Sequence, residues 1–178
     1  MHLLLDPLAE RDVRLGPRLK GLITVQGSVL VLGLGNPLRG DDGVGPRIVE
    51  ELERRELPED VTAMDVGTAG LDLLHLLEGC DRAIVVDAAD VGLKPGQFVR
   101  FTPDEARLAQ NSDGLSFHQV GLSGVLSLAN ALEHALPEIV IFGVQPTEID
   151  WKEGLSPAVE ATIPKLIEVL IEEIEAQL

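Results

Sequence analysis

The chain has 178 residues, of which 45% are hydrophobic, which is the length and composition of one globular domain with its own core. Its formal charge is −16, from 30 acidic and 14 basic side chains, and aromatic residues make up only 3%. A surface of this sign repels phosphate backbones and offers few rings for stacking on bases, so we expect no nucleic-acid partner.

Cys80 is the only cysteine, which excludes an intrachain disulfide and a zinc site built on several thiolates. We interpret it as a small side chain that fills space in a turn. The apolar run Leu3 to Leu5 is too short for the core of a signal peptide, and no stretch reaches the roughly 18–20 apolar residues that span a bilayer. We therefore expect a cytoplasmic protein without membrane insertion.

Residues 1–26 differ from the remainder of the chain. They hold four basic and three acidic residues and so carry a charge of +1 in a chain of −16. We expect a loosely ordered N-terminal arm here, followed by a single α/β domain over residues 27–178.

Strand and helix patterns alternate from Ser28 onwards. The continuous apolar run Val29 to Leu34 predicts a strand buried on both faces. Apolar residues at helical spacing predict a helix between Val44 and Leu52. A second strand is predicted over Val61 to Val66, and a helix over Ala69 to Glu78.

The alternation continues in the second half. A third strand is predicted over Ala83 to Asp87, an edge strand over Gln97 to Phe101, a helix over Leu122 to Leu132 and another buried strand over Ile139 to Val144.

The last helix is predicted to begin at Ser156 and Pro157, as cap and first helical residue. Pro164 should kink or restart this helix. The whole pattern predicts a three-layer α/β/α fold with a mainly parallel sheet.

Polar clusters follow several of the predicted strands. Parallel strands joined by helical crossovers all end at one edge of the sheet, and ligands bind there, where the connections diverge. Asn36 to Asp42, Asp65 to Thr68, Asp87 and His118 are all expected at this edge.

The first of these loops is not a nucleotide-binding loop, because Leu38 stands where a dinucleotide fingerprint has its third glycine and no Gly-Lys-Ser/Thr is present. Asp41 and Asp42 precede a helix, so one of them is a candidate N-cap. A cap needs only one acid, and the second then needs another partner.

Asp87 follows four apolar residues and reaches the end of a buried strand. Either it caps a helix or bonds to a loop, or it belongs to a site. His118, taken alone, is equally compatible with a structural role. Together with Asp42 these residues form a mixed oxygen and nitrogen set, which suits Ni²⁺ or Zn²⁺ with open coordination positions.

Four segments, in this order and spacing, resemble hydrogenase maturation endopeptidases over residues 29 to about 175. They are Gly33-x-Gly35-Asn36-x4-Asp41-Asp42-Gly43-x-Gly45, Asp65-x-Gly67-Thr68-x-Gly70, the strand-end Asp87, and Ser116-x-His118-Gln119-x-Gly121-Leu122.

The resemblance implies a twisted five-stranded sheet with one antiparallel edge strand. It implies that Asp42, Asp87 and His118 are both the metal ligands and the catalytic residues. The implied substrate is the precursor of a nickel-dependent hydrogenase large subunit, whose C-terminal extension is removed after nickel insertion. The nickel would belong to the substrate, and the free enzyme would hold no metal tightly.

The resemblance also implies a set of residues that bind the substrate. They are Asn36, Asp41, Asp65, Gly67, Thr68 and Gly70. Two routes to hydrolysis stay open: the metal polarises the carbonyl or a bound water, or a carboxylate acts as general base.

Two other functions are considered. A non-catalytic checkpoint that binds the nickel-loaded large subunit would use the same three ligands. The segment Gly33 to Pro37 also resembles the opening of peptidyl-tRNA hydrolases, but the acidic residues that follow make a poor tRNA-binding loop.

Overall fold

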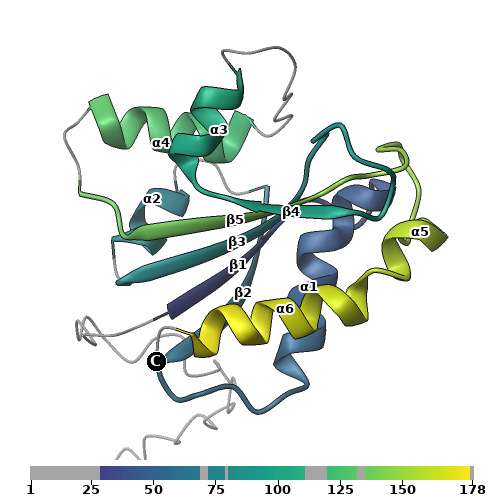
Figure 1. The fold of residues 1–178 in the computed structure, drawn as a ribbon, viewed down its shortest axis with the longest axis horizontal. Coiled ribbons are helices and arrows are strands. Elements are labelled where there is room, and N and C mark those ends of the chain that lie inside the picture. The colour runs from purple at the N-terminus through teal and green to yellow at the C-terminus, as the bar shows by residue number, and fades with distance from the viewer. Residues whose placement is uncertain (1–28, 69–71, 79, 111–119, 132–134, 177–178) are drawn as a thin grey trace, which may run out of the picture.

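The computed structural model describes residues 29–68, 72–78, 80–110, 120–131 and 135–176 (Figure 1). The predicted N-terminal arm, residues 1–26, lies outside this part of the chain. The strands are β1 (Val29–Leu34), β2 (Val61–Gly67), β3 (Arg82–Ala88), β4 (Phe98–Phe101) and β5 (Glu138–Val144).

These strands form one sheet in the order β2-β1-β3-β5-β4. The neighbours β2, β1, β3 and β5 are parallel, and β4 pairs antiparallel with β5 at the edge. The predicted fold class, a mainly parallel five-stranded sheet with one antiparallel edge strand, is confirmed.

Helices cover both faces of the sheet (Figure 1). One face carries α1 (Val44–Glu53), α5 (Pro157–Glu160) and α6 (Ile163–Glu175). The other carries α2 (Asp72–Leu77), α3 (Pro103–Gln110) and α4 (Val120–Ala131). A short 3₁₀ turn, η2 (Gly40–Gly43), leads into α1.

Two apolar clusters fill the spaces between sheet and helices. In β1, Val31 belongs to the cluster under α1 and α6, whereas Leu32 belongs to the cluster under α2 and α4. Both side chains are fully buried, as the continuous apolar run predicts for a strand covered on two sides.

The final helix is interrupted as Pro164 predicts. α5 ends at Glu160, and α6 begins again at Ile163 with the proline in its first turn. Ser156 is the N-cap of α5, and its hydroxyl oxygen accepts a bond from the backbone nitrogen of Val159 at 3.4 Å.

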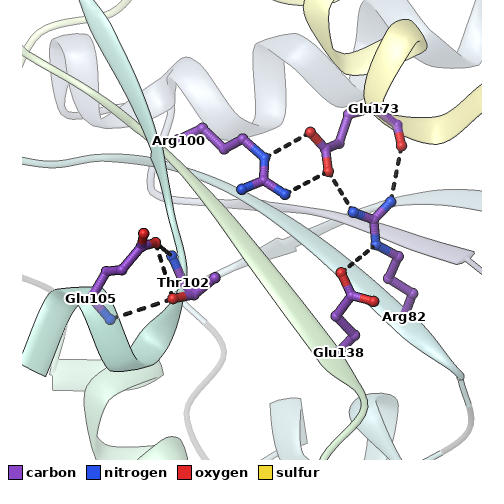
Figure 2. Close-up of polar contacts among 6 residues, drawn as sticks. All are labelled: Arg82, Arg100, Thr102, Glu105, Glu138 and Glu173. Atoms are coloured by element: carbon purple, nitrogen blue, oxygen red, sulfur yellow. Dashed lines mark hydrogen bonds and ion pairs between the residues drawn. The ribbon is translucent and has the colours of Figure 1, made fainter. Parts of the chain in front are cut away.

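Helix α3 was not predicted from the sequence. It begins with a reciprocal cap, in which the backbone nitrogen of Thr102 donates to Glu105 at 2.7 Å and the Glu105 nitrogen donates to the Thr102 hydroxyl at 3.3 Å (Figure 2). Such a Thr-x-x-Glu pattern is a sequence signal for a helix start. The predicted helix over Ala69 to Glu78 is shorter in the described part, over Asp72–Leu77.

An ion-pair network fastens α6 to the sheet. Arg82 is 4% exposed and donates to Glu138 at 3.2 Å and to the carbonyl oxygen of Glu173 at 2.9 Å (Figure 2). The Glu173 carboxylate pairs with both Arg82 and Arg100. Because Arg82 and Glu138 are the first residues of β3 and β5, the network lies at the end of the sheet opposite to the carboxyl ends of the strands.

Candidate active site

The sheet has its topological switch point between β1 and β3. From β1 the chain crosses through α1 to β2 on one side, and from β3 it continues towards β5 on the other. Open α/β sheets bind ligands at such a point, outside the carboxyl ends of the strands. Asp41 and Asp42 follow β1, and Asp87 is the last but one residue of β3, next to this point.

Glycines allow the segment after β1 to fold back onto the strand ends. Gly35 has φ of 122°, and a Cβ there would lie 1.8 Å from the carbonyl oxygen of Asp42. A Cβ on Gly45 would lie 2.2 Å from the oxygen of Leu34 and 2.7 Å from that of Val86. The first turn of α1 therefore rests directly on β1 and β3, which holds Asp42 against the sheet.

Asp41 is 1% exposed and fastens this turn to the connection between β5 and α5. Its carboxylate accepts hydrogen bonds from the backbone nitrogens of Thr147 at 2.7 Å and Ser156 at 2.6 Å, and from the Ser156 hydroxyl at 2.9 Å. These contacts give Asp41 a structural role.

Neither aspartate caps α1. The N-cap residue is Gly43, without a side-chain cap bond, so the capping interpretation of this pair is wrong. Asp42 is 2% exposed, and its Oδ2 accepts a bond from the backbone nitrogen of Asn36 at 2.9 Å. The side chain of Asn36 in turn accepts from the nitrogen of Leu38 at 3.0 Å, which shapes the loop.

Asp87 is 5% exposed, and the pKa of its carboxyl group is shifted from the ordinary value. Burial and, to a lesser extent, the nearby charge of Asp42 together raise the pKa of its carboxyl group to about 7, against the opposing effect of a backbone hydrogen bond at Ala88. Within the described residues its Oδ1 has no hydrogen-bond partner. A buried polar atom left without a partner is costly, and such groups are typical of functional sites.

The loop after β2 lies beside the loop after β1. The backbone nitrogen of Gly67 donates to the Asp65 carboxylate at 2.9 Å, and its carbonyl oxygen accepts from Gly35 at 2.9 Å. Asp65 and Thr68 are exposed. Gly70 lies outside the described residues.

A groove of about 490 Å³ borders this loop, the turn at residues 40–43 and the outer side of α1. Its lining residues are Pro37, Gly40, Gly43, Pro46, Arg47, Val49, Glu50, Glu53, Asp65, Gly154, Leu155 and Glu160. Its charged lining residues are four acids and one arginine, and Gly40 and Gly43 of the turn that carries Asp41 and Asp42 line it as well.

The structure thus brings Asp42 and Asp87 together, but His118 lies outside the described residues. Among the residues that are described, no three His, Cys, Asp or Glu side chains converge on a common point that would hold a metal. None of the described helices is long and apolar enough to cross a bilayer.

Comparison with known proteins decides the family. The model of the hydrogenase maturation protease family matches residues 46–173, most of the chain. The chain belongs to this family. It is 41% identical over 143 residues to the hydrogenase expression/formation protein HupD of Bradyrhizobium diazoefficiens, an alignment that covers 79% of this chain and 74% of HupD.

Other members of the hydrogenase maturation protease family give the same result. The hydrogenase 2 maturation protease of Escherichia coli is 36% identical over 144 residues, which cover 80% of this chain and 88% of that protein. The solved structure of the E. coli hydrogenase maturating endopeptidase HybD superposes with a TM-score of 0.73 at 35% identity, over 84% of this chain and 93% of HybD. The chain is therefore an α/β peptidase.

Sequence reasoning missed the partners of Asp41 in this protease. Thr147 and Ser156 lie more than 100 positions away, and the cap-then-proline pattern at Ser156 predicts a helix start but not a contact with Asp41. The only local signal was the pair of adjacent acids, of which one needed a partner elsewhere.

Proposed function

We propose that this maturation protease removes the C-terminal extension of a nickel-loaded hydrogenase large-subunit precursor. In this proposal Asp42, Asp87 and His118 bind the nickel that the precursor brings, and the free enzyme holds no metal tightly. The observation that carries the proposal is the pair of buried carboxylates at the switch point of the sheet, Asp42 and Asp87.

The electrostatics of this pair favour a cation. Two carboxylates buried side by side repel each other, which is one reason why the pKa of Asp87 is raised to about 7. A divalent ion removes that repulsion, and the unpartnered Oδ1 of Asp87 can bind it as a ligand. Carboxylate oxygens with one imidazole suit nickel, and thiolates of the precursor would complete its coordination.

Such a contact explains selectivity for the loaded precursor. If the enzyme supplies only part of the coordination, its affinity depends on a metal that only the correct substrate carries. Precursor without nickel then binds weakly and stays uncut.

The extension itself has a place beside the carboxylates. We assign the groove along α1 to the extended chain. Asp65 lines this groove, and Gly67 and Thr68 follow it in the same loop, while Asn36 precedes the lining residue Pro37. The backbone of Gly67 has open space around its α-carbon, so a peptide can approach it closely. Gly70 belongs to the same proposed segment.

Two routes to hydrolysis fit these residues. In one, a water polarised by the nickel attacks the carbonyl. In the other, a carboxylate takes a proton from water.

The proposal is tested with the purified chain and its precursor, prepared with and without nickel. We expect a mass loss equal to the extension only in the nickel-loaded sample. A stable complex of unchanged mass would instead identify a non-catalytic checkpoint. Family membership leaves the peptidyl-tRNA hydrolase alternative without support.

A further inference from the structure

An exposed apolar ledge stands beside the candidate active site. Trp151, the only tryptophan of the chain, is 75% exposed, and Leu38 is 51% exposed. The guanidinium carbon of Arg39 lies 6.0 Å from the centre of the Trp151 ring, within the range of a cation–π contact. We call these three residues the ledge. Tryptophan and arginine are the residues that most often dominate protein interfaces.

The backbone holds the ledge in place from two distant parts of the sequence. The nitrogen of Gly40 donates to the carbonyl oxygen of Lys152 at 2.6 Å, and the nitrogen of Lys152 donates to that of Leu38 at 3.0 Å. Arg39 and Lys152 thereby form an isolated parallel bridge. The three bonds to Asp41 fix the same connection at Thr147 and Ser156.

This construction matters for binding. Ordering a mobile loop on association weakens an interface, whereas a surface that is already ordered avoids that loss. The ledge therefore presents a large aromatic side chain on a backbone that is already ordered before a partner binds.

The ledge is continuous with the active site. Arg39 precedes Asp42 by three positions, and the 3₁₀ turn at Gly40–Gly43 joins them. A protein that brings a bound metal to Asp42 and Asp87 lies within reach of the ledge.

The surroundings of the ledge indicate the charge of its partner. Three exposed acids, Glu148, Asp150 and Glu153, are near Trp151 in the sequence, against two cations, Lys152 in the same segment and Arg39 in the ledge itself. Together with the net charge of −16, this favours an apolar patch flanked by basic side chains.

We propose that Leu38, Arg39 and Trp151 dock the folded body of the large-subunit precursor, at an apolar patch with basic neighbours, separately from the contact between the carboxylates and nickel. The proposal rests on the proposed function for the identity of the partner. Recognition then has two independent parts. The carboxylates bind the nickel, and the ledge binds the protein surface of the precursor.

The test measures the dissociation constant of the precursor for a chain that carries Asp87→Ala, so that no cleavage occurs during the measurement. Adding Trp151→Ala should weaken binding about 10-fold or more, as expected for an interface tryptophan. The factor should be the same for precursor with and without nickel, because the ledge does not touch the metal. In the chain with Asp87 intact, Trp151→Ala should raise KM and leave kcat unchanged.

Val99→Ala is the matched control, since Val99 is 37% exposed on the edge strand β4 and does not belong to the ledge. It should leave the dissociation constant unchanged. Trp151→Phe keeps a ring and should retain most of the affinity. Glu153→Lys should weaken binding, more so at low salt.

Four results would overturn the proposal. They are an unchanged dissociation constant for Trp151→Ala, a loss confined to nickel-loaded precursor, tighter binding by Glu153→Lys, and conversion of a dimer of this chain to a monomer by Trp151→Ala. If the unsubstituted chain cuts the precursor while Trp151→Ala changes nothing, only the ledge proposal fails. If the unsubstituted chain does not cut it, the proposed function fails, whatever the ledge binds.

Discussion

Asp41 and Ser156 lie 115 positions apart and are joined by two hydrogen bonds, from the Ser156 nitrogen at 2.6 Å and from its hydroxyl at 2.9 Å. Ser156 also caps α5. One buried carboxylate therefore ties the turn that carries Asp42 to the start of the C-terminal helices. The stability of the fold and the position of Asp42 depend on the same contact.

Replacing Asp41 should destabilise the chain. Asp41→Asn keeps the size of the side chain but turns one of its two accepting oxygens into an amide that donates, so the backbone nitrogen of either Thr147 or Ser156 loses its acceptor. We expect a loss of about 2 kcal/mol in the free energy of unfolding, measured by urea denaturation. Asp150→Asn, at an exposed position, should change it by less than about 0.5 kcal/mol. A loss of that small size for Asp41→Asn would contradict the structural role.

The three proposed nickel ligands should matter for activity and not for folding. Asp42→Ala, Asp87→Ala and His118→Ala should each abolish processing of nickel-loaded precursor while circular dichroism shows a folded chain. Asp104→Asn, at an exposed acid in the first turn of α3, should process normally. Normal processing by Asp87→Ala would refute its proposed role.

Asp87 should give the chain a distinct pH dependence. Its pKa in the folded chain, about 7, lies above its ordinary value of 3.8, so the folded state binds more protons than the unfolded state between these values. By linkage, this contribution to stability is fully present below about pH 4 and is lost as the pH rises to about 7.

The measurement is the free energy of unfolding of the unsubstituted chain minus that of Asp87→Asn, whose side chain does not ionise. This difference should fall between pH 4 and pH 7 and stay level above pH 8. If the difference for Asp87→Asn rises with pH instead, the pKa of Asp87 is not raised in the folded chain.

Two glycines with positive φ should respond very differently to alanine. At Gly35 the new Cβ would collide with the Asp42 carbonyl at 1.8 Å, whereas at Gly67 no atom lies within 4 Å. Gly35→Ala should lower the free energy of unfolding by at least about 4 kcal/mol or prevent folding. Gly67→Ala should cost only the left-handed backbone, about 1–2 kcal/mol. Thermal or urea unfolding of both variants checks this, and equal losses would contradict the close packing at Gly35.

The network around Arg82 should affect stability without affecting catalysis. Arg82→Met leaves Glu173 with Arg100 as its remaining partner and should cost about 3 kcal/mol. Because the network lies at the opposite end of the sheet, kcat at a temperature where the variant is folded should be unchanged. As a comparison, Arg54→Ala removes an exposed ion pair with Glu50 at the C-terminal end of α1 and should lower the free energy of unfolding by less than about 1 kcal/mol. A loss of kcat in Arg82→Met would show that the two ends of the sheet are coupled.

Much of the architecture was predictable because its signals are local. The apolar run at Val29–Leu34 and the proline at position 164 each act within a few residues, and the structure confirms what they predict. The cap at Thr102 and Glu105 was equally local, so the failure to predict α3 reflects a signal that was overlooked.

The sequence by itself determined the chain order of the strands and of the helices other than α3, because apolar periodicity records which face of each element is buried. It also placed Asp42 after the first strand and Asp87 near the end of the third. Only the tertiary structure decided the burial, the pKa shift and the hydrogen-bond partners of the acidic residues at the site. The raised pKa of Asp87 needs both its burial and the charge of Asp42, and Asp41 meets Thr147 and Ser156 only after the sheet has assembled. Desolvation and hydrogen bonding depend on distances in space, and separation along the chain does not encode them.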